Sequence, residues 1–424
     1  MSALYDLLIV GAGPAGFMAA IAGARSGARA LLIEKKENAG RKLLLSGAGR
    51  CNLSHSGEIA DFLANYGHAG RFLKSALYAF TNADARRFFE ERGIRILEEE
   101  TGKLFPVSGK ARDLVDTLLA ETLTASAEIQ CRRALSRLEA PQAPNAAFRA
   151  FCAPAASEAA ADLVHAAVLI EAKRVVLALG GRSYPASGSS GEGYAIAEAL
   201  GHRIVPTAPA LSPLLVSGFP AASLAGTALA DRALAVYRSG SKIARGRGDI
   251  LFTHRGLSGP GILDLSRSVL PGDEIGIELC GRNTDWIDAL VLEGARVHGK
   301  RLVRSLLEPF GLPSRLLQTI VGVSTGDSEA RAASLTKEAR KRLAASLAEL
   351  RMTVDALGDW DEAMATRGGV ALDEVDPKTM ESRIVKGLYF AGEMLDIDGN
   401  TGGYNIQAAF STGFLAGSSA SRSL

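Results

Sequence analysis

Three glycines and one glutamate near the N-terminus have the types and the spacing that dinucleotide binding requires. Gly11, Gly13 and Gly16 form a G-x-G-x-x-G sequence, and Glu34 lies 18 residues after Gly16. The first glycine of such a motif permits a tight turn, the second lets the backbone approach a pyrophosphate, and the third allows close packing of a helix on a strand. Glu34 can accept hydrogen bonds from both ribose hydroxyls of an adenosine, and its charge repels a 2′-phosphate.

The neighbouring segments supply the elements that must position these residues. Residues 7–10 are a short apolar run, LLIV, which predicts a buried strand ending at Gly11. A helix is expected over 14–25, followed by a second strand over 30–33. The N-terminus of that helix offers free N–H groups and a positive dipole to the phosphates. We therefore expect a dinucleotide held by Gly11, Gly13, Pro14, Ala15, Gly16, Glu34 and Lys35.

A second glycine-rich segment near the C-terminus has the composition of a flavin site. Residues 388–391 predict a strand that ends in Gly392 and Glu393, and a helix is expected from Tyr404 to about Ala416. An acid at this strand end can bond the ribityl hydroxyls of a flavin, and the loop before the helix can direct N–H groups at the pyrimidine end of the ring. FAD explains both ends of the chain, with contacts expected from Gly392, Glu393, Thr401, Gly402, Gly403, Tyr404, Asn405 and Ile406.

Residues 40–52, GRKLLLSGAGRCN, contain too much glycine for a regular element and place three cations beside a cofactor with two phosphates. The candidates for cofactor contact here are Arg41, Lys42, Ser46, Gly47, Gly49, Arg50, Cys51 and Asn52. Cys51 either packs against the ring or, close to cations, acts as a thiolate of low pKa. It has no neighbouring cysteine, so a dithiol relay within this loop is excluded. Asn52 is expected to hold the loop by hydrogen bonds.

Composition narrows the class of protein. The 424 residues suffice for two or three domains, and 47% of them are hydrophobic against 22% charged. Lys plus Arg number 48 and Asp plus Glu 46, so the bulk charge predicts neither a nucleic-acid nor a membrane partner. The four cysteines lie far apart, which predicts neither a metal site nor a disulfide framework. No apolar run is long enough to span a bilayer. We expect a cytoplasmic protein with a small-molecule substrate, and the sequence makes no prediction of its oligomeric state.

The order of the segments predicts a discontinuous domain. Residues 174–181, RVVLALGG, return to the strand-then-glycine pattern and add Gly180 to the expected cofactor contacts. From 203 to 281 the chain predicts short strands broken by Pro and Gly, and 283–350 predicts helices. We therefore expect an α/β, Rossmann-like FAD-binding domain of the glutathione-reductase type over 1–202 and 356–424. A β-rich and helical domain is inserted over 203–355.

Long phrases of the sequence resemble one family nearly end to end. These are the N-terminal glycine motif, GRKLLLSGAGRCN, LFPVSGKARDL at 104–114, LALGGRSYPASGSSGEGYAIAEALGH at 177–202, DILFTHRGLSGPGILDLSR at 249–267, and GGYN at 402–405. The chain resembles the bacterial BaiN-type, or aminoacetone-oxidase-like, NAD(P)/FAD-dependent oxidoreductase flavoproteins. The resemblance implies an FAD domain of the two-dinucleotide-binding type with an inserted β-rich and helical domain. The chain departs from the family's usual polar run after Cys-Asn, with Leu-Ser-His at 53–55.

Three side chains are candidates for catalysis, all weaker than the cofactor motifs. His254 precedes a turn of the inserted domain and can protonate a substrate because its ordinary pKa is near neutrality. Tyr184 can donate to a carbonyl oxygen, and Cys51 is the third candidate.

The expected activity is transfer of hydride equivalents from NAD(P)H, docking transiently, to a small organic acceptor, with a conjugated carbonyl favoured. The flavin carries the chemistry while the protein binds and orients. Two alternatives stay open: an oxidase of an amine or aminoketone that uses oxygen, and an FAD-bound RNA- or protein-interaction module with little turnover. The choice between NADH and NADPH also stays open.

Overall fold

The computed structural model describes residues 4–143, 146–154 and 168–424, which form two compact units. The first unit combines residues 1–209 with 364–424, and the second comprises Ala210–Ala363. The two units have separate hydrophobic cores. Among the described residues, no helix is both long and apolar enough to cross a membrane.

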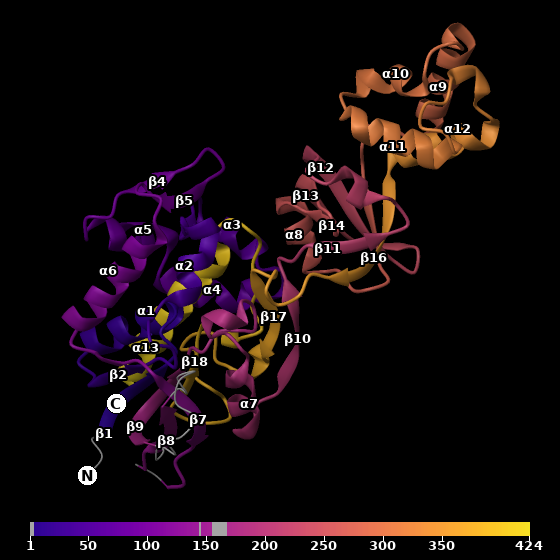
Figure 1. Ribbon diagram of the computed structural model, residues 1–424. Helices are drawn as coiled ribbons and strands as arrows, with labels where there is room; N and C mark the ends of the chain where they lie inside the picture. Colours follow the sequence, from indigo (N-terminus) through magenta and orange to yellow (C-terminus); the bar gives the residue numbers. More distant parts are fainter. Residues whose placement is uncertain (1–3, 144–145, 155–167) are drawn as a thin grey trace. The chain divides into compact units, whose positions relative to one another are not determined.

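A seven-stranded sheet forms the centre of the first unit (Figure 1). Its strand order is β6-β2-β1-β9-β8-β7, and β18 pairs with the second half of β9. The strands β6, β2, β1, β9 and β18 are parallel, so their carboxyl ends share one edge. The strand bounds are β1 (Leu4–Val10), β2 (Ala30–Ile33), β6 (Glu128–Gln130), β7 (Arg133–Glu139), β8 (Phe148–Pro154), β9 (Val168–Leu177) and β18 (Leu388–Phe390).

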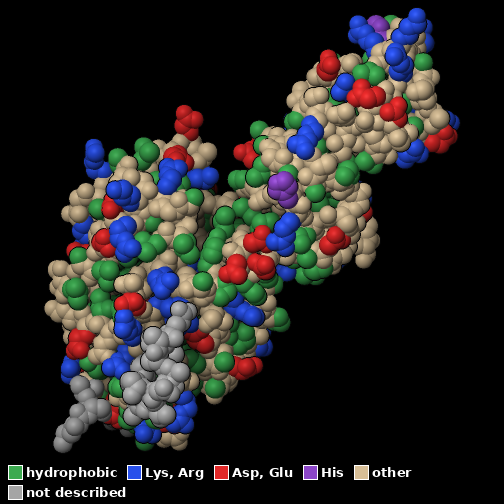
Figure 2. Space-filling model, in the orientation of Figure 1, with side chains coloured by type: hydrophobic (Ala, Val, Ile, Leu, Met, Phe, Trp, Pro, Cys, Tyr) green, Lys and Arg blue, Asp and Glu red, His purple; other side chains and the backbone are tan. Residues whose placement is uncertain are grey.

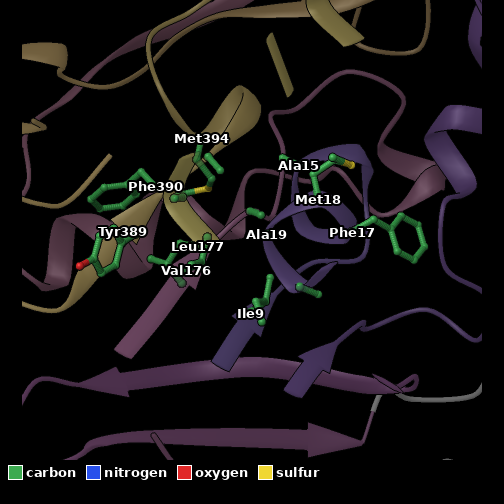
Figure 3. Close-up of a cluster of buried hydrophobic side chains, with 14 of the residues drawn as sticks. Ile9, Ala15, Phe17, Met18, Ala19, Val176, Leu177, Tyr389, Phe390 and Met394 are labelled. Carbon is green, nitrogen blue, oxygen red and sulfur yellow. The ribbon is translucent and has the colours of Figure 1, made fainter. Parts of the chain in front are cut away.

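Two parallel helices, α1 (Pro14–Arg25) and α13 (Tyr404–Arg422), pack on each other beside this sheet. Glycines of α13 make the contact close, because a Cβ at Gly413 would lie 2.1 Å from the carbonyl oxygen of Ala15 and one at Gly417 would lie 2.2 Å from that of Ala19. Figure 3 shows side chains of α1, including Phe17 and Met18, in the buried cluster with residues of β1, β9 and β18. The ends of the chain are thus joined in one core.

The remaining elements of the first unit surround this core. Its other helices are α2 (Arg41–Leu45), α3 (Ile59–Ala64), α4 (Gly70–Ala79), α5 (Asn82–Glu90), α6 (Ala111–Thr124) and α7 (Glu192–Ala199). A small sheet has the order β3-β5-β4, and a separate strand pair is β10–β17. These strands are β3 (Ser54–His55), β4 (Ile96–Glu98), β5 (Lys103–Pro106), β10 (Ile204–Ala210) and β17 (Ala365–Val370). The helix α2 corrects the expectation that 40–52 holds no regular element; it begins after Gly40, whose φ of +72° is left-handed.

The second unit contains a closed six-stranded barrel of order β11-β14-β13-β12-β15-β16, together with five helices among its described residues. The strands are β11 (Leu214–Ser217), β12 (Ala228–Arg238), β13 (Ser241–Phe252), β14 (Gly256–Ser258), β15 (Glu274–Ile277) and β16 (Leu350–Leu357). The helices are α8 (Pro260–Ser266), α9 (Thr284–His298), α10 (Val303–Leu307), α11 (Ser314–Thr325) and α12 (Lys337–Ala348). Barrel and helical residues contribute to one hydrophobic core.

The α/β fold class predicted from the sequence is confirmed, and the domain limits differ slightly from the expected ones. The sequence placed the insertion at 203–355, whereas the second unit comprises Ala210–Ala363. The difference has a physical cause: β10 pairs with β17, and this pairing joins 204–209 to the first unit.

The contact between α1 and α13 leads to a prediction. Gly417→Val places methyl groups where Ala19 backbone already lies, so we expect a loss of about 3 kcal/mol in the free energy of unfolding. Ser419→Val, on a partly exposed position of the same helix, is the matched control for β-branching. Urea unfolding of both variants measures the difference. Equal stability of the two variants would show that the helices do not pack in this way.

Candidate functional site

The glycine-rich turn between β1 and α1 combines two packed glycines with one open position. Gly11 has a φ of +102°, and a Cβ there would lie 2.5 Å from the carbonyl oxygen of Ala178; at Gly16 a Cβ would lie 1.8 Å from that of Gly11. At Gly13, which precedes Pro14 at the start of α1, a Cβ would meet no atom within 4 Å. The first and third glycines are therefore required by the protein itself. The space at Gly13, in front of a helix N-terminus, fits a pyrophosphate.

Glu34 is fixed beside this turn at the end of β2. Its carboxylate accepts hydrogen bonds from the backbone N–H of Ala12 at 3.0 Å and of Lys36 at 2.8 Å. These bonds place the acid where an adenosine ribose is expected next to the pyrophosphate. Lys35 instead contacts Ser190 at 2.9 Å and pairs with Glu192, so its ammonium is occupied by the loop before α7 and by the first residue of that helix.

The N-termini of α1 and α13 point in the same direction, with an offset along the helix axes. Ala15 contacts Gly413 and Ala19 contacts Gly417, so the two helices run side by side in this register. Pro14, the first residue of α1, therefore lies level with residue 412, which is eight residues after the start of α13 at Tyr404. Eight helical residues span about 12 Å. Between them Gly392, with a φ of +66°, approaches α1, since a Cβ there would lie 3.0 Å from Cβ of Ala15. One long ligand can therefore meet two sets of free helix N–H groups.

A buried ionic contact joins three of the predicted segments. Nζ of Lys42 on α2 lies 2.5 Å from the carboxylate of Glu393, after β18, and 2.5 Å from Oγ of Ser183, in the loop after β9. Ser183 is fully buried, and the two charged side chains are mostly buried. A cation and an anion held together at the edge of the sheet can orient the phosphate and hydroxyl groups of a dinucleotide. Sequence reasoning missed Ser183.

The loop after α2 is strained. Gly47, Ala48, Gly49 and Cys51 all have left-handed backbone, with φ values of +55°, +54°, +85° and +58°. Such a conformation in the non-glycine residues Ala48 and Cys51 costs on the order of 1 kcal/mol each and is found mainly at functional sites. Oγ of Ser46 donates to the carbonyl oxygen of Leu43 at 2.6 Å, which holds the start of the loop.

The Cys51 thiol is not a thiolate in this environment. The side chain is fully buried, and this burial raises its pKa to about 12. The structure therefore favours the packing role over the nucleophilic one, because the thiolate is the reactive form.

Asn52 differs from its expected role. Its Oδ1 is buried and has no hydrogen-bond partner among the described residues, so this oxygen does not hold the loop. A buried acceptor without a donor costs about 1–3 kcal/mol. An N–H group of a bound ring would satisfy it, which fits a flavin in this position.

The two arginines of the loop segment have different surroundings. The guanidinium of Arg50 pairs with Glu99 at 2.7 Å and lies 4.0 Å from the ring centroid of Phe105. Arg50 is therefore held by the protein rather than left for a phosphate. Arg41, at the start of α2, is exposed.

Contacts with other parts of the chain fix the conformation of the GGYN segment at 402–405. A Cβ at Gly403 would lie 2.5 Å from the carbonyl oxygen of Ser54, and one at Gly402 would lie 3.2 Å from the Tyr404 ring. At Gly403 it is therefore β3, a part of the protein itself, that forbids a side chain. The side chain of Asn405 is hydrogen-bonded to Gly399: its Oδ1 accepts from the Gly399 N–H at 2.8 Å, and its Nδ2 donates to the Gly399 carbonyl oxygen at 2.9 Å. The backbone N–H groups of Asn405 and Ile406, at the start of α13, are the remaining donors, beside half-buried Thr401.

His55 is a second residue that sequence reasoning did not select. Its ring stacks on Tyr404 with centroids 5.1 Å apart and an interplanar angle of 16°, and its Nδ1 lies 2.7 Å from the carbonyl oxygen of Ser56. The signal was present, since His55 ends the Leu-Ser-His run in which the chain departs from the family pattern.

The other catalytic candidates lie on two different units. Tyr184 follows Ser183 and has a left-handed backbone, with φ +53° and ψ +62°. Gly180, at the start of the same loop, has a φ of +77°. His254 is exposed on the turn between β13 and β14 in the second unit, and its role as a proton donor stays a prediction. No cluster of His, Cys, Asp or Glu that could hold a metal occurs in the part of the chain that the structure describes.

Comparison with known proteins gives near-complete matches. Residues 5–419 match the family model described as "HI0933-like protein Rossmann domain". A 3-dehydro-bile acid delta(4,6)-reductase of Clostridium scindens is 30% identical over 97% of this chain and 98% of that protein. A ribosomal RNA dihydrouridine synthase of Escherichia coli is 32% identical over 96% of each chain. Among solved structures, a 3-ketosteroid delta1-dehydrogenase of Sterolibacterium denitrificans has a TM-score of 0.51 at 12% identity, covering 99% of this chain and 100% of that one, which is a likeness of fold.

The position of Glu34 leads to a prediction about cofactor affinity. Glu34→Gln removes the charge that we expect to accept the ribose hydroxyls, so FAD should bind about 10- to 100-fold more weakly. Glu37→Gln, in an exposed pair with Arg132, is the control with the same chemical change. Titration of the apoprotein with FAD, followed by flavin fluorescence, measures both dissociation constants. Unchanged affinity in Glu34→Gln would place the ribose elsewhere.

The environment of Cys51 predicts low reactivity. With a pKa of about 12, only about one thiol in ten thousand is ionised at pH 8, so alkylation by iodoacetamide is slow, and its rate rises about tenfold per pH unit until the pH nears 12. Half-buried Cys131 is the internal comparison and should be labelled first. Mass spectrometry of peptides after timed labelling gives both rates. Preferential labelling of Cys51 at pH 7 would restore the thiolate hypothesis.

Proposed function

The chain belongs to the HI0933-like family and is an FAD-dependent oxidoreductase; from this premise we propose that it reduces a carbon–carbon double bond conjugated to a carbonyl group. The reducing equivalents come from NAD(P)H. When bound, FAD supplies the two-electron chemistry, accepting hydride from the reductant and delivering it to the substrate.

One observation carries the choice of substrate class. Two relatives of nearly full length are named for different substrates, a 3-dehydro bile acid with delta(4,6) unsaturation and a uridine of ribosomal RNA. Both substrates contain a C=C bond conjugated to a C=O group, and both names describe its reduction. The property that the two relatives share is therefore the reduction of a conjugated C=C bond, and this shared property supports the proposal.

The protein's part in this reaction is binding and orientation. The turn at Gly13 and the carboxylate of Glu34 hold the adenosine diphosphate half, and the Lys42–Glu393 pair orients the chain that connects it to the ring. The N-terminus of α13 lies about 12 Å further along, where its N–H groups can stabilise negative charge on the far end of the ring. Oδ1 of Asn52 is a further acceptor for a ring N–H.

Tyr184 is the proton donor in this proposal. Two hydrogen bonds from Ser187, at 2.9 and 2.7 Å, hold the Tyr184 carbonyl and fix its left-handed backbone. The half-buried phenol has no hydrogen-bond partner among the described side chains, and the neighbouring Ser183 contacts Lys42. Hydride adds to the β-carbon of the conjugated system, while the phenol O–H bond breaks and its proton forms a C–H bond at the α-carbon. Solvent then returns a proton to the phenolate.

NAD(P)H is proposed to dock transiently. The sequence has one strand–G-x-G-x-x-G–helix unit with a terminal acid, at 7–34. The similar segment GSSGEG at 188–193 runs into the start of α7 and follows a loop instead of a strand.

Anaerobic stopped-flow spectroscopy tests the proposed function. We expect NADH or NADPH to bleach the flavin, and a conjugated enone to reoxidise it faster than oxygen does. Rapid reoxidation by oxygen with no response to the enone would instead support the oxidase alternative. Failure of both nucleotides to reduce a flavin that dithionite reduces would contradict an NAD(P)H-linked reductase.

Replacement of the proton donor separates the two half-reactions. Tyr184→Phe should slow enone reduction about 100-fold or more while NAD(P)H still reduces the flavin at the wild-type rate. Tyr78→Phe, an exposed tyrosine of α4, is the control. Products formed in D₂O report the α-carbon proton directly. Equal rates for wild type and Tyr184→Phe in both half-reactions would exclude the phenol as donor.

A further inference from the structure

The side chain of His55 lies at the start of α13, where the ring end of the cofactor is expected. His55 ends β3, and its imidazole stacks on the ring of Tyr404, the first residue of α13, with centroids 5.1 Å apart. A Cβ at Gly402 would lie 3.4 Å from Cδ2 of His55, so the imidazole also lies beside the backbone that leads into this helix. His55 is therefore a neighbour of the N–H groups that α13 leaves without intrahelical partners.

One nitrogen of this imidazole is engaged and the other is open. Nδ1 of His55 lies 2.7 Å from the carbonyl oxygen of Ser56, which can only accept a hydrogen bond, so Nδ1 carries a proton. Nε2 has no hydrogen-bond partner among the described residues. In the neutral ring Nε2 is an acceptor, and a second proton would turn it into a donor. Because the side chain is only half-buried, that proton can come from solvent.

Within the described parts of the chain, no acidic side chain pairs with this imidazole. Its cross-strand partner on β5 is Lys103, itself a cation, and α13 has no charged residue before Arg422. The other charged residues of the surrounding elements are paired with one another or exposed: the pairs are Glu99 with Arg50, Asp84 with Arg87 and Arg86 with Glu90, and the exposed residues are Glu58, Asp61 and Glu100. Lys103 and the positive end of the α13 dipole both oppose a cation at His55.

The wider surface does not decide the charge of this ring. Figure 2 shows Lys and Arg side chains interspersed with Asp and Glu on the visible face, and the net charge of the chain is +2. Exposed charges of mixed sign are largely screened beyond a Debye length, about 8 Å at physiological ionic strength. The groups beside His55 therefore decide whether it carries a second proton. A negative charge on a bound ligand is the favourable partner that the described residues around the ring do not supply.

From this placement we propose that His55 takes up a proton from solvent when the bound FAD is reduced and releases it when the FAD is reoxidised. Two electrons from the reductant and one proton convert the oxidised ring to its anionic form, and the negative charge is expected at the end near α13. A second proton forms the Nε2–H bond of His55, which then has an anion as its partner. The coupling is reciprocal, because the protonated imidazole stabilises the anion as much as the anion stabilises the protonated imidazole. The inference depends on the FAD site and not on the acceptor that the proposed function names.

The test counts the protons that the FAD-loaded protein takes up for every two electrons. Midpoint potentials are measured by dithionite titration with reference dyes from about pH 5.5 to 8.5, the range around the ordinary pKa of histidine, and their slope against pH gives the count. The wild type should take up about two protons over part of this range. His55→Gln and His55→Phe should take up about one at every pH, although the second variant keeps an aromatic ring against Tyr404. His298→Gln, at an exposed position of α9, is the control with the same chemical change and should match the wild type.

A second measurement reads His55 directly in the wild type. The chain has six histidines, and in NMR spectra of protein with isotope-labelled imidazole the signal of His55 is the one that both His55 variants lack. This signal should titrate at higher pH in the reduced protein than in the oxidised protein. The affinity for oxidised FAD should be nearly the same in the wild type and both variants, because the oxidised ring has no negative charge for His55 to meet.

Four results would overturn the inference: one proton per two electrons in the wild type at every pH, two protons in the wild type and both variants alike, a His55 signal whose titration does not move on reduction, or loss of FAD binding in both variants. The second result would assign the extra proton to the flavin, and the fourth would give His55 a structural role. Dithionite supplies the electrons and no organic acceptor is present, so these outcomes are independent of enone reduction. A His55-dependent proton count in a protein that does not reduce the enone contradicts the proposed function alone.

Discussion

The close parallel packing of α1 and α13 is the constraint on which the FAD-binding unit depends. Carbonyl oxygens of α1 occupy the space that side chains at Gly413 and Gly417 would need, so the two helices can be in register only with glycine there. That register sets the offset of about 12 Å between two helix N-termini that point the same way. This spacing matches an elongated ligand that has a negatively charged group near its middle and a second group, at one end, that becomes negative during the reaction. Helices near both ends of the chain therefore have to pack together to form this part of the site.

Near those helix ends several polar groups are held in fixed positions but have hydrogen-bonding capacity that other protein groups do not satisfy. Lys42 and Glu393 neutralise each other, which allows both to be largely buried, and each still has hydrogen-bonding capacity for a ligand. Oδ1 of Asn52 has no hydrogen-bond donor within the described parts of the chain, and the nearby residues Ala48 and Cys51 keep strained backbone conformations. Unsatisfied acceptors and strain both oppose folding of the empty protein. A bound flavin that meets these groups stabilises the folded state, so cofactor affinity and stability are linked.

The sequence predicted what local patterns determine. The motif of Gly11, Gly13 and Gly16, the acid at Glu34 and the alternation of strands and helices require only short-range periodicity, and the fold class was confirmed. Side-chain contacts between distant segments were not predictable in this way. Nothing local in the sequence says that Arg50 stacks on Phe105, that Ser183 meets Lys42, or that β3 makes glycine obligatory at Gly403. The domain boundary was displaced for the same reason, since the pairing of β10 with β17 joins segments far apart in the chain.

The insertion has the features of a segment that can vary in sequence without disturbing the FAD-binding unit. Ala210–Ala363 has its own hydrophobic core and a closed barrel, which leaves no open sheet edge that must be covered by the FAD-binding unit. It begins and ends next to the paired strands β10 and β17, so its two ends are held close together. Lengthening such a segment costs little additional closure entropy, because that cost grows only with the logarithm of loop length. Surface residues of α9 can thus change without disturbing the packing of α1 on α13.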